Sequence, residues 1–131
     1  MFLHLLSQPQ KQAFFDLAQR LSMIDGEEDV SELSMLNQLK FRLGLPDGPN
    51  MQAVASALDV SAFDTQQSKT IAMMELLSIA YVDDFLADAE SQLISDIAVA
   101  FGFNQSGLNK MAEWAMSTLE LVNRGEALIR S

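Results

Sequence analysis

Acidic residues gather in two short segments of the chain that could hold a cation. Asp25 and Glu32 flank the first segment, and Asp83 and Glu90 flank the second. Carboxylate oxygens are the ligands that hard cations such as Ca²⁺ and Mg²⁺ take in proteins. The spacing differs from that of an EF-hand loop, which has ligands at alternate positions and a glycine at the sixth. These four residues are therefore the candidate metal ligands, with Ca²⁺ or Mg²⁺ as the candidate cofactor.

The same carboxylates have a structural interpretation. Asp29 and Glu32 fit a capping box, in which the first residue caps a helix and the second reaches back to it. Glu32 and Glu90 also stand near expected helix starts, where the helix dipole favours a negative charge. A basic partner protein that docks on the acidic segments is a further alternative. Helix capping, a weakly bound divalent cation and a protein-docking surface therefore remain open at this point.

The sequence offers little for catalysis. It has no cysteine, which excludes disulfides, zinc–thiolate sites and thiol catalysis. His4 lies in an apolar segment without a serine or cysteine nucleophile motif, which favours a packing or surface role over that of a general base. Gly44, Gly48 and Gly102 are typical of caps and turns rather than of a phosphate-binding loop. We therefore expect no enzyme activity and no catalytic or cofactor-binding residues.

Length and charge limit the classes of partner. The chain has 131 residues and a net charge of −10, which suits one domain spanning residues 1–131. Such a negative surface repels nucleic acid and anionic membranes, so we expect a protein partner, whose identity the sequence does not give. No apolar run is long enough for a bilayer, and the N-terminal segment lacks the features of a signal peptide. We therefore expect a cytoplasmic protein without direct membrane insertion.

Scarce proline and glycine favour an all-α fold, a single-domain bundle of about six to seven helices. Apolar periodicity predicts helices from near Pro9 to Ile24, up to Gly44, over about 50–58, over a buried 65–82, up to Gly102, and from Gln105 past Val122. The last helix carries an apolar stripe of Leu108, Met111, Ala112, Ala115, Leu119 and Val122. The expected core includes Leu21, Leu36, Ile79, Ile94 and Ile97.

An internal repeat relates the two acidic segments. Apolar positions recur at an offset of 58 residues, so that Leu36 matches Ile94 and Leu39 matches Ile97. A glycine after a helix adopts the left-handed conformation and lets the next apolar residue fold back onto the last turn. Residues at the expected helix ends follow the same offset: Asp25, Glu32 and Gly44 match Asp83, Glu90 and Gly102. The sequence therefore predicts two pseudo-symmetric helix–loop–helix units.

These features resemble the tellurite-resistance TerB family and its TerB-like relatives. The shared elements are an Asp-Gly-type loop after a helix, an acidic residue seven positions later and a glycine near the end of the next helix. Here they are Asp25-Gly26 with Glu32 and Gly44, then Asp83-Asp84 with Glu90 and Gly102. The resemblance covers residues 14–114. It implies an all-helical, TerB-like acidic domain linked to stress response and tellurite resistance, with divalent cations bound by the acidic loops. The alternative is a non-catalytic protein–protein interaction module without a metal.

Overall fold

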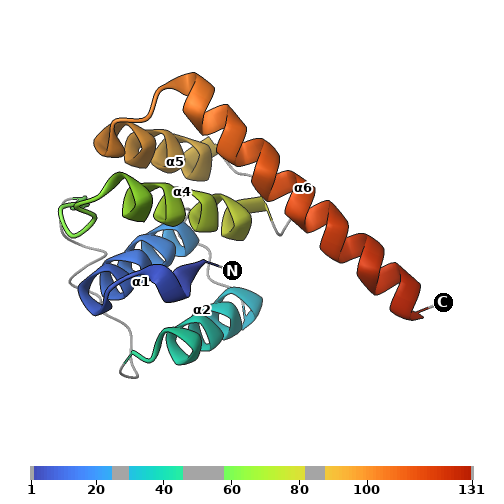
Figure 1. Ribbon diagram of the computed structural model, residues 1–131. Helices are drawn as coiled ribbons and strands as arrows, with labels where there is room; N and C mark the ends of the chain where they lie inside the picture. Colours follow the sequence, from blue (N-terminus) through green and yellow to red (C-terminus); the bar gives the residue numbers. More distant parts are fainter. Residues whose placement is uncertain (1, 25–29, 46–57, 82–87, 131) are drawn as a thin grey trace.

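The computed structural model describes residues 2–24, 30–45, 58–81 and 88–130. Helices are the only regular secondary structure in this part of the chain, which confirms the all-α prediction (Figure 1). None of its helices is long and apolar enough to cross a membrane. The predicted helix over 50–58 lies outside the described residues, apart from Leu58. The elements are η1 (Leu3–Leu5), α1 (Gln8–Met23), α2 (Val30–Leu43), α4 (Gln66–Tyr81), α5 (Asp88–Phe101) and α6 (Gln105–Arg130).

Helices α1 and α4 begin with the same reciprocal cap. The Ser7 hydroxyl accepts from the amide of Gln10 (3.4 Å), and the Ser7 amide donates to the Gln10 side chain (2.9 Å). At α4 the Ser68 amide donates to the Thr65 hydroxyl (3.0 Å), and the Thr65 amide donates to the Ser68 hydroxyl (3.2 Å). Each arrangement satisfies amides that the first turn of a helix leaves unpaired. Both caps confirm the predicted helix starts, and they lie 58 residues apart.

Helices α2 and α5 end on the two predicted glycines. Gly44 has φ +70° and Gly102 has φ +86°, a region that side chains with a Cβ rarely adopt. The amide of Gly44 donates to the carbonyl of Phe41 (3.1 Å), and that of Leu45 donates to Lys40 (3.1 Å). Two equivalent bonds, of 2.9 and 3.0 Å, lie 58 positions further along. Both ends are therefore Schellman motifs, which pair the last carbonyls of the helix.

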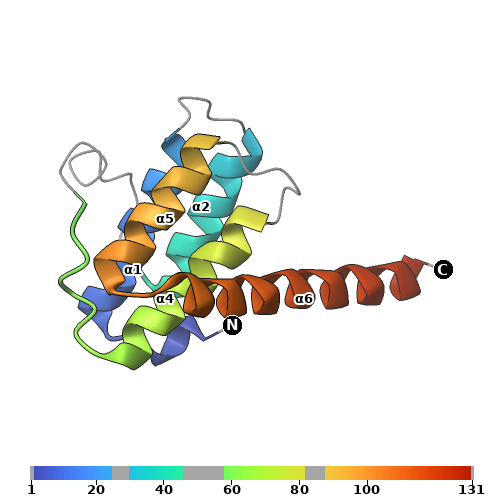
Figure 2. The ribbon, with the colours of Figure 1, turned by 90° about the horizontal axis from the view of Figure 1, so that it is seen from above.

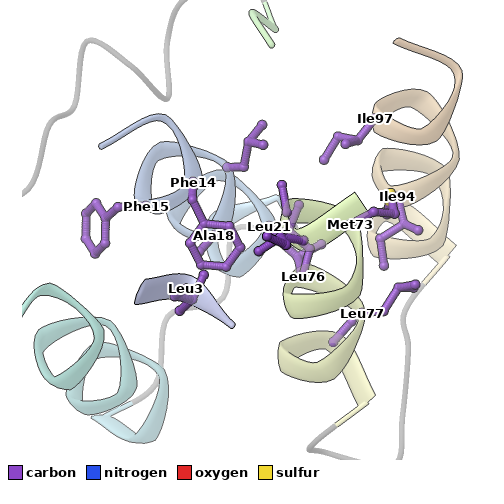
Figure 3. Close-up of a cluster of buried hydrophobic side chains, with 14 of the residues drawn as sticks. Leu3, Phe14, Phe15, Ala18, Leu21, Met73, Leu76, Leu77, Ile94 and Ile97 are labelled. Atoms are coloured by element: carbon purple, nitrogen blue, oxygen red, sulfur yellow. The ribbon is translucent and has the colours of Figure 1, made fainter. Parts of the chain in front are cut away.

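Helix α4 forms the centre of the bundle. It contacts α1, α5, α6 and η1, and it lies between α1 and α5 (Figure 1). The expectation of a buried central helix is confirmed, because its buried residues surround most of its circumference. Figure 3 shows the core where three helices meet: Phe14, Ala18 and Leu21 of α1, Met73, Leu76 and Leu77 of α4, and Ile94 and Ile97 of α5.

Four of the five predicted core residues are buried: Leu21, Leu36, Ile94 and Ile97. Ile79 was also predicted to be buried in the core, but its side chain is only half-buried and packs against the core from its edge. Ile79 belongs to the last turn of α4, and the end of a helix is covered on fewer sides than its middle. The register predicted for the other helices is therefore confirmed by burial.

Helix α6 differs most from its prediction. Of the predicted stripe, Met111 and Ala115 are buried and Leu119 is half-buried, but Val122 is 50% exposed. The helix has 26 residues, whereas α4, its main neighbour, has 16. The C-terminal half of α6 therefore runs past the bundle and extends away from the other helices (Figures 1 and 2). Val122 lies on the expected stripe, but no described helix covers it.

Candidate functional site

The two helix turns that carry Glu32 and Glu90 lie at one end of the bundle. Helices α1 and α4 run in one direction, and α2 and α5 run in the other (Figures 1 and 2). The C-terminal ends of α1 and α4 and the N-terminal ends of α2 and α5 therefore lie at the same end. Glu32 is the third residue of α2, and Glu90 is the third residue of α5. The fold thus brings the helix turns that carry these two glutamates to a common end.

The four predicted ligands are described to different extents. Asp25 and Asp83 lie outside the described residues, as does Asp29 of the predicted capping box, and the side chain of Glu32 is also outside them. Glu90 is half-buried and is engaged with a neighbouring group. Among the described residues, no three acidic or histidine side chains lie close enough to hold a metal ion. The four-residue metal site therefore stays a prediction.

Helix dipoles act on this acidic end. The N-terminal turns of α2 and α5 carry a partial positive charge, which stabilises nearby carboxylates by about 0.3–1 kcal/mol each. Glu32 and Glu90 stand in these first turns. The two helix starts therefore offer carboxylates a favourable position without a cation. Capping and cation binding are both compatible with this arrangement.

Basic residues gather at the opposite end of the first two helices. A hollow of about 300 Å³ is lined by Leu3, His4, Lys11, Arg42 and Leu43. Arg42 lies in the last turn of α2, where the helix dipole favours a cation, and the exposed His4 has the surface role expected from sequence. The basic hollow therefore lies at the end of α1 and α2 that is opposite the first turn of α2.

A polar cluster lies on α1 near α2. Lys40 is buried, and its ammonium group lies 4.9 Å from the centre of the Phe15 ring. Burial raises the pKa of Asp16, although a hydrogen bond from Gln12 (3.1 Å) and the positive charges of Arg20 and Lys40 act in the opposite direction. No serine, threonine or cysteine nucleophile accompanies these groups in the described contacts. The cluster has the composition of a structural charge network rather than of a catalytic centre.

A second hollow lies along α6. A groove of about 830 Å³ runs between this helix and the end of α4. Most of its lining surface is apolar, although two glutamates and one arginine also line it. It is lined by Tyr81, Glu113, Met116, Ser117, Leu119, Glu120, Asn123, Arg124 and Ala127. No sequence pattern predicts this groove, because it exists only where α6 diverges from the bundle.

The projecting half of α6 exposes large apolar side chains. Leu121 is 68% exposed and Ile129 is 84% exposed. Together with Val122 and Gly125 they form the α6 surface, since residues three, four, seven and eight apart share one side of a helix. A Cβ added at Gly125 meets nothing within 4 Å, so this side of the helix is open. Ile129 follows Val122 by seven residues, and this spacing was the sequence signal for the surface.

The chain matches no family model, no curated protein and no solved structure. The resemblance to the TerB family therefore rests on the sequence features alone.

Proposed function

We propose that this chain is a non-catalytic binding module that docks a protein partner through the α6 surface. The exposure of Leu121, Val122 and Ile129 on a projecting helix carries the proposal. Scattered exposed apolar residues are ordinary, but several on one side of one helix are typical of interaction sites. An amphipathic helix meets its partners through such spacing, with contacts at every third or fourth residue.

In-cell photocrosslinking tests this function. A photoreactive amino acid at Val122 should give a discrete protein adduct. The control is the same amino acid at Val99, which is 75% exposed on α5 and lies outside the α6 surface. We expect the adduct at Val122 only. Identical adduct patterns at the two positions would contradict the proposal, because exposure alone would then explain the crosslinks.

We also propose a TerB-like organisation for the domain, with a pseudo-twofold relation between its helix–loop–helix units in a bundle of about six to seven helices. The support comes from matching helix ends in the two units. Ser7 and Thr65 cap their helices in the same way, and Gly44 and Gly102 end theirs with the same hydrogen bonds. The proposal extends to a cytoplasmic protein of one domain with a role in stress response, as the resemblance implies.

Divalent-cation binding is the second candidate function. Glu32 and Glu90 occupy the same position of α2 and α5, and both helices start at one end of the bundle. With Asp25 and Asp83 they would offer four carboxylates to Ca²⁺ or Mg²⁺, with a Kd on the order of 10⁻⁴–10⁻³ M.

Thermal melting at constant ionic strength tests the cation site. A ligand that binds only the folded chain raises the melting temperature by mass action. We expect Ca²⁺ or Mg²⁺ to raise it more than a monovalent salt, and this difference should vanish in Asp25→Asn/Asp83→Asn. Equal effects of the two salts would indicate charge screening, and helix capping would then explain the acidic residues.

A further inference from the structure

We propose that the basic hollow at the end of α1 and α2 binds the phosphate group of a small phosphate ester. The hollow is lined by Leu3 and His4 of η1, Lys11 of α1, and Arg42 and Leu43 of α2. Its volume of about 300 Å³ lies at the lower limit for small-molecule sites. None of these residues belongs to the α6 surface, so the proposal goes beyond the docking function and does not depend on it.

The basic residues of the hollow gather although the chain is acidic. The sequence has 18 Asp and Glu residues and 8 Lys and Arg residues, yet none of the described acidic residues lines the hollow. Within the part of the chain that the structure describes, neither Lys11 nor Arg42 forms an ion pair with a carboxylate. Arg130, by contrast, pairs with Glu126 at 3.2 Å. Like charges that share a hollow repel each other, and a bound anion would offset this repulsion.

Lys11 occupies an unfavourable position for a cation. It is the fourth residue of α1, and the N-terminal end of a helix carries a positive partial charge. The first turn of α1 has no acidic residue to offset this charge. Arg42 differs, because it lies in the last turn of α2, where the helix dipole favours a cation. An anion shared with Arg42 would provide the negative charge that Lys11 lacks.

The repeat supplies an internal comparison for the hollow. At the offset of 58 residues, Lys11 corresponds to Lys69, which is also half-buried and is the fourth residue of α4. Arg42, however, corresponds to Ala100, and His4 corresponds to Ala62. A requirement of the helix start would explain a lysine in both units, but it would not explain an arginine and a histidine in the first unit alone. The second unit therefore keeps one of the three basic residues that line the hollow.

Charge and shape favour a phosphate ester among the anions. Lys11 and Arg42 supply two positive charges, which match the charge of about −1.5 to −2 on a phosphate monoester at neutral pH, whereas a carboxylate carries one. An arginine can donate two parallel hydrogen bonds to phosphate oxygens, and a lysine acts as a point charge. Leu3 and Leu43 are buried in the core, so they give the hollow fixed apolar walls. An organic group attached to the phosphate would pack against these walls.

Titration with phenyl phosphate at constant ionic strength tests the site, with the amide signals of the ¹⁵N-labelled chain as the readout. We expect saturable shifts confined to residues around the hollow, with a Kd on the order of 10⁻³ M. Arg42→Gln and Lys11→Gln should each raise this Kd at least about 10-fold, because each removes a charged hydrogen-bond donor. Lys69→Gln is the matched control in α4 and should leave the Kd unchanged. Shifts spread over the whole chain, or equal losses of binding in Lys11→Gln and Lys69→Gln, would overturn the site.

The fold of the variants can be checked in the same spectra. Arg42 is exposed and Lys11 is half-buried, so their glutamine variants should keep the dispersed amide signals of the bundle. Arg42→Lys keeps the charge but loses the second hydrogen bond, so its Kd should lie between those of the wild type and Arg42→Gln. An unchanged Kd in both Arg42 variants would show that phosphate binds elsewhere, and the proposal would fail.

Two further titrations define the class of ligand. Benzoate carries the same ring with a single charge, and inorganic phosphate carries the charge without the ring. We expect both to bind more weakly than phenyl phosphate. Equal binding of benzoate would show that the hollow does not select a doubly charged group. Equal binding of inorganic phosphate would show that the apolar walls of Leu3 and Leu43 add nothing, and either result would overturn the assignment of a phosphate ester.

Discussion

The first unit, α1 with α2, and the second unit, α4 with α5, share a frame but differ in their interiors. Each helix of the second unit spans the positions of its counterpart shifted by 58 residues. Inside this frame the first unit buries Gln19 and Lys40, where the second unit buries Leu77 and Ala98. The caps repeat because helix ends impose one backbone geometry, whereas interior residues vary with what each helix contacts.

The second unit also buries a charged residue at a position where the first unit has an apolar one. Glu75 is buried in the second unit, where the first unit has Leu17. An oxygen of Glu75 accepts a hydrogen bond from the amide of Phe2 (3.0 Å), and the Phe2 ring lies 5.8 Å from that of Trp114. Helix α4 therefore holds the N-terminal segment as well as α6. A buried carboxylate is tolerated there because it has hydrogen-bond partners.

Truncation of the shared core position should give the largest effect. Ile97 is fully buried on α5, and Leu39 occupies the matching place on α2 with 5% exposure. We expect Ile97→Ala and Leu39→Ala each to lower the free energy of unfolding by about 2–5 kcal/mol. Ile97→Ala should cost more, because α5 borders the central helix. Urea denaturation measures both changes. An unchanged midpoint for either variant would contradict the view that positions 39 and 97 play the same role in the two units.

The two glycine caps should respond equally to substitution. Added Cβ atoms at Gly44 and Gly102 meet nothing within 4 Å, so the cost of Gly44→Ala or Gly102→Ala comes from the positive φ alone. We expect each substitution to lower the free energy of unfolding by about 1–2 kcal/mol. Gly125→Ala is the matched control inside a helix, and it should stabilise α6 by about 1 kcal/mol. Clearly unequal losses of stability at the two caps would mean that their surroundings differ although their hydrogen bonds are the same.

Much of this frame could be predicted from sequence, because its signals are local. Pro9, Thr65, Gly44 and Gly102 mark helix ends through the conformations and hydrogen bonds of their own neighbours. Apolar spacing gave the buried face of each helix in the bundle. The position at which α6 leaves the bundle was not predictable, because Val122 has the same local pattern as Ala115. Its exposure depends on where a different helix, α4, ends.

The candidate sites were less predictable than the fold. The repeated acidic residues predict a site beside the starts of α2 and α5, but spacing alone does not separate capping from cation binding at Glu32 and Glu90. The basic hollow joins Lys11 of α1 to Arg42 of α2, and this contact between distant segments leaves no sequence motif. The α6 surface had a signal, the seven-residue repeat of Val122 and Ile129, but burial was the simpler expectation.

A buried side-chain amide, that of Gln19, distinguishes the first unit from the second. Gln19 is 2% exposed, and its side-chain oxygen has no hydrogen-bond partner among the described residues. An unsatisfied buried acceptor costs about 1–3 kcal/mol, and the second unit has Leu77 at this position. We expect Gln19→Leu to stabilise the chain by about 1 kcal/mol. The control is Gln92→Leu at an exposed position of α5, which should change stability little. Destabilisation by Gln19→Leu would show that the amide is satisfied in solution.

The smallest expected effect concerns the charge of Asp16, whose counterpart in the second unit is Met74. Burial raises the pKa of Asp16 above its ordinary value of 3.8. The folded chain therefore holds this proton more tightly than the unfolded chain does. The contribution of the carboxyl group to folding is most favourable below 3.8, and it is lost as the pH rises through the folded pKa. At neutral pH the ionised group opposes folding, although Gln12, Arg20 and Lys40 offset part of this cost.

Asp16→Asn should therefore raise the melting temperature at neutral pH, and its advantage over the wild type should shrink as the pH falls below about 4. Asp96→Asn provides a matched control, because Asp96 is exposed and accepts a hydrogen bond from Gln92 (2.9 Å), as Asp16 does from Gln12 (3.1 Å). Thermal melts of both variants and the wild type between pH 3 and 7 measure the difference. An advantage of Asp16→Asn that grows on acidification would reverse the assigned sign. The carboxylate would then stabilise the first unit through Lys40 and Arg20, and burial would not be the dominant influence on its charge.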